Sequence, residues 1–218
     1  MQRLAWIVAV LALMSGAARA FDRSGALPSP QDETLRGNPA LSAPASAPTG
    51  GNVSVPIGWV EFCADAANAG DCVVEPAQAR DVVMTRAVQK LVDRINRNVN
   101  AAIAPISDME NYGVEERWAY PTNGRGDCED YVLLKRRLLI EAGVPRQSLL
   151  VTVVRDRAGE GHAVLTLTTT KGDYILDNKR DDLRLWTATG YAFVKRQSQE
   201  DPNRWVDLRV GASMTAAR

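Results

Sequence analysis

The apolar residues of this chain change their spacing near Gly143 and Pro145, and this change limits the fold more than any other feature. Before it, apolar side chains recur every three to four residues, which is the period of a helix with one buried face. After it, they form short runs and alternations with period two, which is the pattern of β-strands. Helices followed by strands predict an α+β domain with an antiparallel sheet.

Two helices are expected before the change. The first runs from Ala77 to Ala102, where apolar positions follow one helical face and charged residues lie between them. The second begins near Cys128, with Asp127 as a suitable N-cap and Asp130 in a weak capping-box pattern. The glycine and proline at the change in spacing end it.

The strands come after the second helix. The expected segments are Leu149–Val154, Ala163–Thr169, Tyr174–Leu176 and Tyr191–Val194. A turn at Lys171-Gly172-Asp173 joins the second segment to the third, so these two form a hairpin.

The first twenty residues, 1–20, have the pattern of a cleavable export signal. Arg3 supplies the positive charge, Leu4–Met14 the apolar run, and Ala18-Arg19-Ala20 a small-residue cleavage site. The apolar run is too short to span a membrane as a helix, so we expect no transmembrane segment in the mature chain.

Composition divides the rest of the chain into a spacer and one domain. Residues 21–56 are rich in Pro, Ala, Ser and Gly and contain few large apolar side chains, so we expect a flexible spacer. Residues 57–212 form the expected domain. Without Arg3 and Arg19 the chain has 24 basic against 26 acidic residues, and this near balance argues against nucleic acid as a partner.

The three cysteines differ in their surroundings. Cys63 and Cys72 bracket a short loop, and in an oxidising compartment after export we expect them to form a disulfide. A metal site is the alternative, but this stretch lacks the further ligands that it would need. Cys128 is then left as an odd thiol, which in an exported protein requires an explanation.

A nucleophile, a base and an orienting carboxylate follow one another in the sequence. Cys128 lies at the start of a helix, His162, the single histidine, at the start of a strand, and Asp177 at the end of one. Unpaired N–H groups and the helix dipole lower a thiol pKa, so Cys128 is the candidate nucleophile. His162 is the candidate base and Asp177 the residue that fixes its tautomer. The alternative is a structural cysteine, a satisfied histidine and a turn-capping aspartate.

The hairpin leaves the distance between His162 and Asp177 open. A two-residue turn at Lys171 and Gly172 places Thr166 opposite Asp177 and puts His162 on the same face. The two side chains would then be four residues apart along the strand, or roughly 13 Å. Direct contact requires a bulge or a wider loop.

Three carboxylates surround the candidate nucleophile, namely Asp127, Glu129 and Asp130. Unpaired, they would raise the thiol pKa. One interpretation is helix capping together with a favourable interaction with the helix dipole. The other is a site for a hard cation such as calcium, whose charge would cancel theirs at the sulfur.

Four motifs resemble those of the bacterial transglutaminase-like cysteine proteinases, the LapG family. They are Trp118-Ala-Tyr-Pro121, Gly126-Asp-Cys-Glu-Asp-Tyr131, Gly161-His-Ala-Val-Leu165 and Ile175-Leu-Asp-Asn178. The likeness covers about Trp59 to Trp205. It implies a papain-like, transglutaminase-like α+β fold in which helices pack on an antiparallel sheet and the nucleophile begins a helix.

The resemblance also implies a function. In such a periplasmic cysteine endopeptidase Cys128, His162 and Asp177 form the triad, and Asp127 and its acidic neighbours Glu129 and Asp130 hold calcium. Family members cut a large surface adhesin at an Ala-Ala type site and so control attachment and biofilm. An inner-membrane cyclic-di-GMP receptor inhibits them. The spacer is not part of the family pattern, and many members have no assigned substrate.

Two other functions remain open from the sequence. An acyltransferase or transglutaminase-like enzyme would use the same triad with an amine as the acceptor in place of water. A calcium-responsive binding protein would keep the fold and use the cleft only for docking. Only the enzymes require a reactive thiol at Cys128.

Overall fold

The computed structural model describes residues 46–76 and 81–209. The predicted export signal and residues 21–45 of the predicted spacer lie outside these residues. In the part of the chain that is described, no helix has both the length and the apolarity that a membrane crossing requires.

A seven-stranded antiparallel sheet forms the centre of the domain, with the order β1-β9-β8-β4-β5-β6-β7. Its strands are β1 (Asn52–Val53), β4 (Leu149–Arg155), β5 (Gly161–Thr169), β6 (Gly172–Asp177), β7 (Arg180–Leu185), β8 (Ala192–Gln197) and β9 (Trp205–Asp207). The helices are α2 (Ile57–Ala64), α3 (Arg86–Ala102), α4 (Asp108–Tyr112) and α5 (Cys128–Glu141). Short strands β2 (Ala104–Pro105) and β3 (Arg125–Gly126) pair in parallel beside them. The α+β prediction is confirmed.

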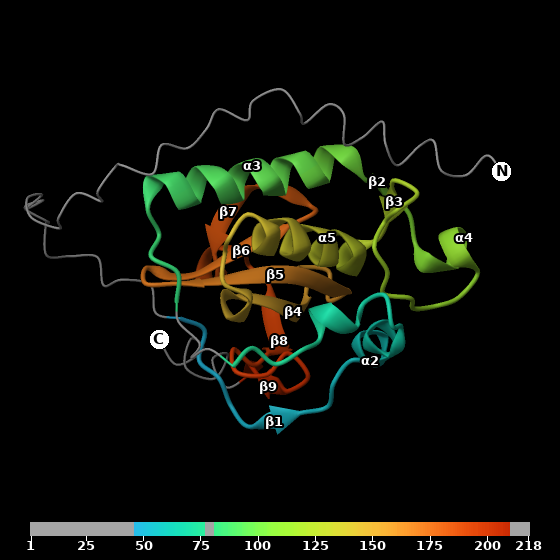
Figure 1. The fold of residues 1–218 in the computed structure, drawn as a ribbon, viewed down its shortest axis with the longest axis horizontal. Helices are drawn as coiled ribbons and strands as arrows, with labels where there is room; N and C mark the ends of the chain where they lie inside the picture. The colour runs from blue at the N-terminus through green and yellow to red at the C-terminus, as the bar shows by residue number, and fades with distance from the viewer. Residues whose placement is uncertain (1–45, 77–80, 210–218) are drawn as a thin grey trace, which may run out of the picture. The chain divides into compact units, whose positions relative to one another are not determined.

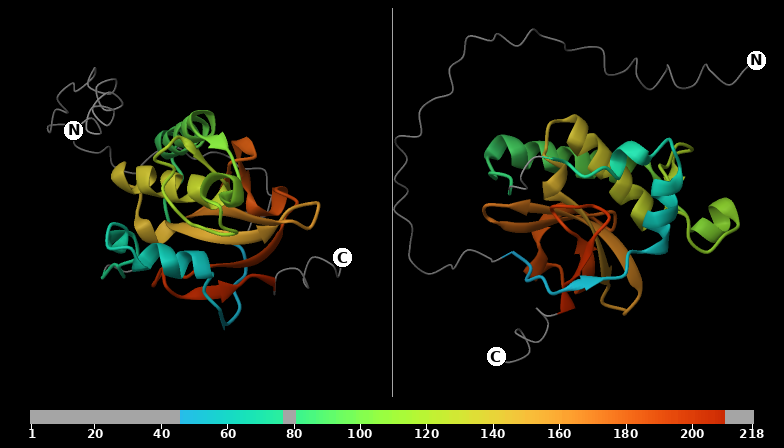
Figure 2. Two further views of the ribbon diagram at one scale, coloured as in Figure 1. Left: turned by 90° about the vertical axis from the view of Figure 1, so that its right-hand side faces the viewer. Right: turned by 60° about the horizontal axis from the view of Figure 1, so that its bottom comes forward.

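The long helices α3 and α5 lie together on one face of the sheet (Figures 1 and 2). The core between the layers is apolar and includes Val92, Leu133, Leu139, Val151, Leu165, Leu167 and Leu176. A second cluster is built around alternate residues of the central strands, among them Val164 and Ile175. Side chains of a strand point alternately to its two faces, so the sheet carries apolar surface on both.

The end of the predicted spacer is part of the fold. Ala47 is buried in the second cluster, and its N–H donates to Asp173 Oδ2 at 3.0 Å. Asn52 and Val53 form β1 and pair with β9. The prediction of a flexible spacer as far as Pro56 is therefore wrong for residues 47–56. Composition reports on side chains, whereas these residues are held mainly through backbone hydrogen bonds.

Helix α3 begins later than predicted, at Arg86. Thr85 caps it and accepts a hydrogen bond from the Val88 N–H at 3.2 Å. The apolar Val82, which fits the helical period, instead forms a parallel bridge to Thr169. A strand-like segment can therefore continue a helical pattern by chance, and the N-cap marks the true start.

Strand β7 was not predicted because its residues are mostly charged and half of them are exposed. It follows the turn after Asp177 and pairs with β6 at the edge of the sheet. Edge strands commonly carry charge, which reduces pairing with other chains. The same charge removes the apolar alternation on which the prediction of strands depends.

The disulfide between Cys63 and Cys72 is present and closes a loop with a sequence separation of nine. Asn203 links this loop to the β8–β9 connection, since its Nδ2 donates to the Cys72 carbonyl at 2.8 Å. Its Oδ1 accepts from Trp59 Nε1 at 3.2 Å. The predicted pairing is confirmed, and the hydrogen bonds of Asn203 join α2 and its loop to the β8–β9 connection.

Candidate active site

Cys128 is the first residue of α5, and Asp127 stands at the N-cap with an extended backbone. The Asp127 side chain makes no cap hydrogen bond. Asp130 does not cap the helix either, because its Oδ1 accepts from the Ala119 N–H at 2.9 Å. The weak capping box is therefore a wrong prediction, and these carboxylates are arranged for something other than holding the helix end.

The Cys128 thiol is half-buried and lies between β5 and its own helix. Its Sγ accepts from the Ala163 N–H at 3.3 Å, and the thiol donates to Glu129 Oε2 at 3.1 Å. Burial and then the Glu129 carboxylate raise the pKa of the Cys128 thiol, against the expectation of a lowered value. Desolvation and nearby negative charge therefore outweigh the helix dipole at this sulfur.

The hairpin places His162 and Asp177 in contact, with Nε2 and Oδ1 2.9 Å apart. Thr169 pairs with Gly172 and Leu165 with Leu176, so the turn is one residue earlier than Lys171-Gly172. When the turn moves by one residue, each residue of β5 pairs with a β6 residue two positions earlier. Thr166, for example, pairs with Ile175 and not with Asp177. His162 and Asp177 therefore lie closer along the sheet than the 13 Å predicted, and no bulge is required.

The Asp177 carboxylate is buried and accepts three hydrogen bonds. Besides the imidazole, the Lys179 N–H donates to Oδ1 at 3.0 Å and the Tyr191 hydroxyl donates to Oδ2 at 2.5 Å. Burial raises the pKa of Asp177, but these donors outweigh it, led by His162, and hold the pKa below its usual value. Asp177 is thus an anion at neutral pH.

Helix α3 fixes the backbone that carries Asp177. Asn100 Nδ2 donates to the Asp177 carbonyl at 3.0 Å and to Asp181 Oδ1 at 2.9 Å. Asn96 Nδ2 donates to the carbonyls of Arg180 and Asp181, each at 3.0 Å. Two amides one helical turn apart therefore clamp the β6–β7 turn. Polar residues on a helix are usually read as solvent-exposed, so sequence reasoning missed them.

Cys128 and His162 line the same cavity, whose volume is about 350 Å³. Trp118, Val153, Lys195 and Glu116 contribute to its walls. Although the thiol and the imidazole both reach this space, the hydrogen bonds of the sulfur go to Ala163 and Glu129, and none joins it to the imidazole. The arrangement offers a thiol, an oriented imidazole and room for a peptide at one place.

A larger hollow of about 940 Å³ adjoins this cavity, and both include Glu116 and Trp118 in their walls. Trp118 is buried, with its ring edge-on to Trp59 and Trp205 and its Nε1 donating to Glu116 Oε1 at 2.7 Å. Gly58 lies directly against the indole, where a Cβ would be 2.2 Å from Cδ1. Trp118 therefore forms part of the wall of both spaces.

Three carboxylates gather near the start of α5, from Asp108, Asp127 and Asp130, with ligand atoms all within 4.8 Å of one another. Each has a buried oxygen that lacks a hydrogen-bond partner. Burial raises the pKa of Asp130 to about 7 and that of Asp127 to about 6, and the neighbouring charges add to both shifts. Unsatisfied oxygens on crowded carboxylates fit a hard cation, which takes oxygen ligands.

This group differs from the predicted ligand set of Asp127, Glu129 and Asp130. Glu129 turns to the Cys128 thiol, and burial together with Asp127 raises its pKa to about 9. Asp108 joins the cluster from α4, where its Oδ2 also accepts from the Arg117 N–H. Asp108 was missed because it is about twenty residues away along the chain and only the fold brings it close.

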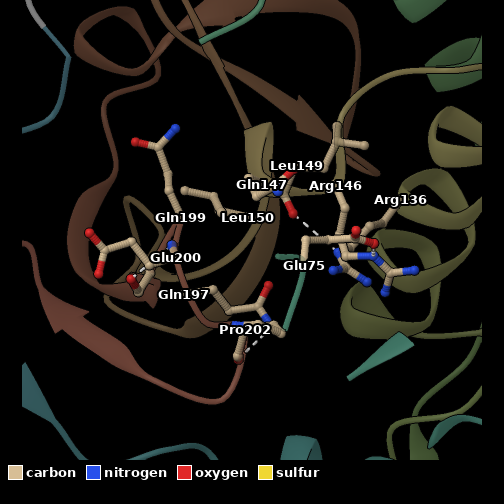
Figure 3. Close-up of a pocket in the computed structure, with 11 residues that line it drawn as sticks. Glu75, Arg136, Arg146, Gln147, Leu149, Leu150, Gln197, Gln199, Glu200 and Pro202 are labelled. Atoms are coloured by element: carbon tan, nitrogen blue, oxygen red, sulfur yellow. Dashed lines mark hydrogen bonds and ion pairs between the residues drawn. The ribbon is translucent and has the colours of Figure 1, made fainter. Parts of the chain in front are cut away.

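A separate small pocket lies between the start of β4 and the β8–β9 connection (Figure 3). Arg146 and Glu75 pair there at 3.1 Å, and Gln197 donates to the Pro202 carbonyl. The cavity volume of about 10 Å³ is the size of a single water site. Neither the thiol nor the imidazole lines it.

The sequence profile of the bacterial transglutaminase-like cysteine proteinases (BTLCP) matches residues 49–213. The chain belongs to this family. Its members are cysteine proteinases, so this chain is a cysteine peptidase whose substrate is a protein. No curated protein matches the chain.

Solved structures of Legionella pneumophila LapG are similar to this BTLCP chain. The calcium-bound form has 23% identity over 55% of this chain and 68% of that chain, with a TM-score of 0.48. The EGTA-treated form has 24% identity over 50% and 62%, with a TM-score of 0.45. A further LapG structure has 23% identity over 60% and 74%, with a TM-score of 0.48. Membership of the family rests on the sequence match.

Proposed function

We propose that this BTLCP protein is a calcium-dependent cysteine endopeptidase with Cys128 as nucleophile, His162 as base and Asp177 as its orienting residue. The observation that carries the proposal is the 2.9 Å contact between His162 Nε2 and Asp177 Oδ1, with the imidazole and the thiol lining one cavity. A base oriented by a third group beside a nucleophile is the arrangement that acyl transfer requires.

The contact at Nε2 assigns the two ring nitrogens. Asp177 accepts the Nε2 proton, so Nδ1 of the neutral ring is free to accept the thiol proton. The thiolate then attacks the peptide carbonyl, and the backbone N–H groups in the first turn of α5 stabilise the oxyanion. The imidazolium returns the proton to the leaving amine, and water hydrolyses the acyl-enzyme with the same base.

The calcium part of the proposal rests on the three unsatisfied carboxylate oxygens. Asp108, Asp127 and Asp130 would hold the ion, and Glu129 is close enough in sequence to join them on rearrangement. A bound cation supplies positive charge that offsets the carboxylates and favours the ionised thiol. Calcium-bound and EGTA-treated forms of the LapG structures are in keeping with such a site.

The biological setting is proposed from the resemblance to the LapG family. The enzyme would act in the periplasm after export, and its substrate would be a large surface adhesin cut at an Ala-Ala type site to control attachment and biofilm. An inner-membrane cyclic-di-GMP receptor would inhibit it. The cavity of about 350 Å³ beside Cys128 is large enough for small side chains on both sides of the scissile bond.

The test is cleavage of an Ala-rich fluorogenic peptide by the purified chain with calcium, compared with Cys128→Ala and Asp177→Asn. We expect Cys128→Ala to be inactive and Asp177→Asn to lose about 10²–10⁴ in kcat, because the imidazole loses its orienting charge. Asp182→Asn, the same change at an exposed position on β7, is the matched control and should be fully active. Cleavage by Cys128→Ala would refute the proposal, and incorporation of a labelled amine in place of hydrolysis would favour the transferase.

A further inference from the structure

The hollow of about 940 Å³ that adjoins the catalytic cavity is not used by the proposed reaction. Its walls come from three places, namely α2 with the loop after it, the segment 112–122, and Arg137 of α5. Glu116 and Trp118 belong to its walls and also to those of the cavity that Cys128 lines. The two spaces are therefore neighbours, and a chain bound in one can continue into the other.

A protein substrate extends beyond the catalytic cavity. The cavity of about 350 Å³ is large enough for small side chains on both sides of the scissile bond. An extended polypeptide advances by roughly 3.3–3.6 Å per residue, so residues further along the substrate lie outside this cavity. Binding sites in proteins commonly have volumes of about 300–1,000 Å³, and the hollow is near the upper end of this range. It has the size to hold a further stretch of the same substrate.

Two guanidinium groups in the walls of the hollow are fixed against tyrosine rings. Arg117 Cζ is 4.6 Å from the centre of the Tyr112 ring, and Arg137 Cζ is 4.4 Å from the centre of the Tyr120 ring. Stacking of this kind uses the flat face of a guanidinium and leaves the N–H groups at its edge to donate. The exposed ion pair of Arg137 with Glu141, at 3.6 Å, uses only Nε. The hollow therefore offers oriented donors for the carbonyl oxygens of an extended chain.

The other side chains of the hollow favour an uncharged occupant with an apolar residue. Val114 is 44% exposed in its wall, and the two tyrosines are half-buried. The carboxylates of Glu61, Asp65 and Glu116 also line it, so its charges nearly balance those of the two arginines. A strongly acidic or strongly basic segment would meet like charges on one wall, whereas a neutral segment would not. An apolar side chain would remove the exposed valine surface from water.

We infer that the hollow is the part of the substrate cleft that receives an extended, uncharged segment of the protein substrate, with a large apolar side chain, on one side of the scissile bond. The inference rests on the proposed function, because it takes Cys128 as the residue that attacks this bond. Arg117, Arg137 and Val114 are then residues that determine specificity. The small cavity selects the residues at the bond, and the hollow selects the sequence beyond it.

The experiment measures the binding of fluorescent peptides to Cys128→Ala by anisotropy, with calcium present. A short Ala-rich peptide is compared with the same peptide extended by about eight neutral residues that include leucines, first before the cleavage site and then after it. We expect one extension to tighten binding by about tenfold or more and the other to change it little. In this background Arg137→Ala should remove most of that gain, since arginines often dominate binding energy. Arg94→Ala, at an exposed position on α3, is the control and should keep it.

Equal affinity for the short peptide and for both extended peptides would overturn the inference, as would an unchanged gain in Arg137→Ala. Val114→Glu tests the apolar wall independently and should also reduce the gain. Val83→Glu changes a valine that is 64% exposed outside the hollow and should not. Replacing the leucines of the extended peptide by lysines or by glutamates should abolish the gain, and tighter binding of either charged peptide would contradict an uncharged occupant.

A second copy of this chain is the other occupant that the test can reveal. A concentration-dependent dimer on size-exclusion chromatography that Val114→Glu abolishes would mean that the hollow is an interface between copies, and this would overturn the inference. The proposed function fails separately, through cleavage by Cys128→Ala. Loss of the extension gain would leave cleavage that depends on Cys128 intact, so the two failures are distinguishable.

Discussion

Substitution of Asp130 by Asn tests the acidic cluster most directly. Asp130 is fully buried at the start of α5, where one oxygen accepts from the Ala119 N–H and the other has no partner. An Asn keeps the shape and an acceptor for that N–H but removes the charge. The change therefore isolates the cost of ionising this group among its acidic neighbours.

The size and sign of the effect follow from the pKa of Asp130, which burial raises from 3.8 to about 7. A carboxyl whose pKa is higher in the folded state binds more protons there than in the unfolded chain, so stability falls as pH rises between these two values. Between pH 5 and pH 7 the loss from this one group is about 2 kcal/mol. For a domain of this size that corresponds to a fall in Tm of roughly 4–8 °C.

The assay is thermal unfolding in chelator and in calcium at pH 5 and pH 7. In chelator, Asp130→Asn should lose less stability over this range than the unsubstituted protein, and at pH 7 it should be the more stable of the two. In calcium the unsubstituted protein should gain stability with pH, because ligands must be ionised to bind, whereas the variant should gain little. Asp65→Asn, at an exposed position, should behave as the unsubstituted protein does.

The reasoning fails if, in chelator, the difference in stability between the unsubstituted protein and Asp130→Asn is the same at pH 5 and at pH 7. It also fails if calcium leaves both melting curves unchanged at pH 7. The first result would mean that Asp130 ionises without cost in its buried position. The second would mean that its unsatisfied oxygen does not meet a cation.

Three further changes test other parts of the structure. Replacing both Cys63 and Cys72 by Ser should lower the free energy of unfolding by about 3 kcal/mol in urea, from the loop entropy of a separation of nine residues, and an unchanged midpoint would contradict this. Tyr191→Phe removes a 2.5 Å hydrogen bond to the Asp177 carboxylate and, with Asp177 as the proposed orienting residue, should lower kcat about tenfold in peptide cleavage with KM unchanged. An unchanged kcat would count against a role of Tyr191 in alignment. Gly58→Ala brings a methyl group to 2.2 Å from Cδ1 of Trp118 and should lower the free energy of unfolding by about 1–3 kcal/mol in the same urea assay. Gly70→Ala is the control, because a Cβ there has no atom within 4 Å, and it should show no such loss.

The sequence was sufficient where a residue's role depends on its immediate neighbours. Cys128 begins a helix because an extended Asp127 precedes a long run of helix-compatible residues. Cys63 and Cys72 pair because the short loop between them keeps their sulfurs close. In both cases the deciding interaction lies within about ten residues, so local reasoning reaches it.

Sequence reasoning failed where the fold brings distant segments together. Asp108 reaches Asp127 and Asp130 only because α4 and α5 both contact β3, and no local pattern reports this. The register between His162 and Asp177 depends on which two residues form the turn, and a shift of one changes the pairing by two. The direction of the Cys128 pKa shift depends on burial, which composition does not give.

Strand β1 has a practical consequence for anyone who shortens this protein. A version trimmed to the compositional boundary at Pro56 would lack Asn52 and Val53, and β9 would then end the sheet with an open row of backbone groups. Such a bare edge invites self-association, so a trimmed enzyme could precipitate even with an intact catalytic centre. Expression boundaries are better placed ahead of Ala47, whose amide is tied to the sheet through Asp173.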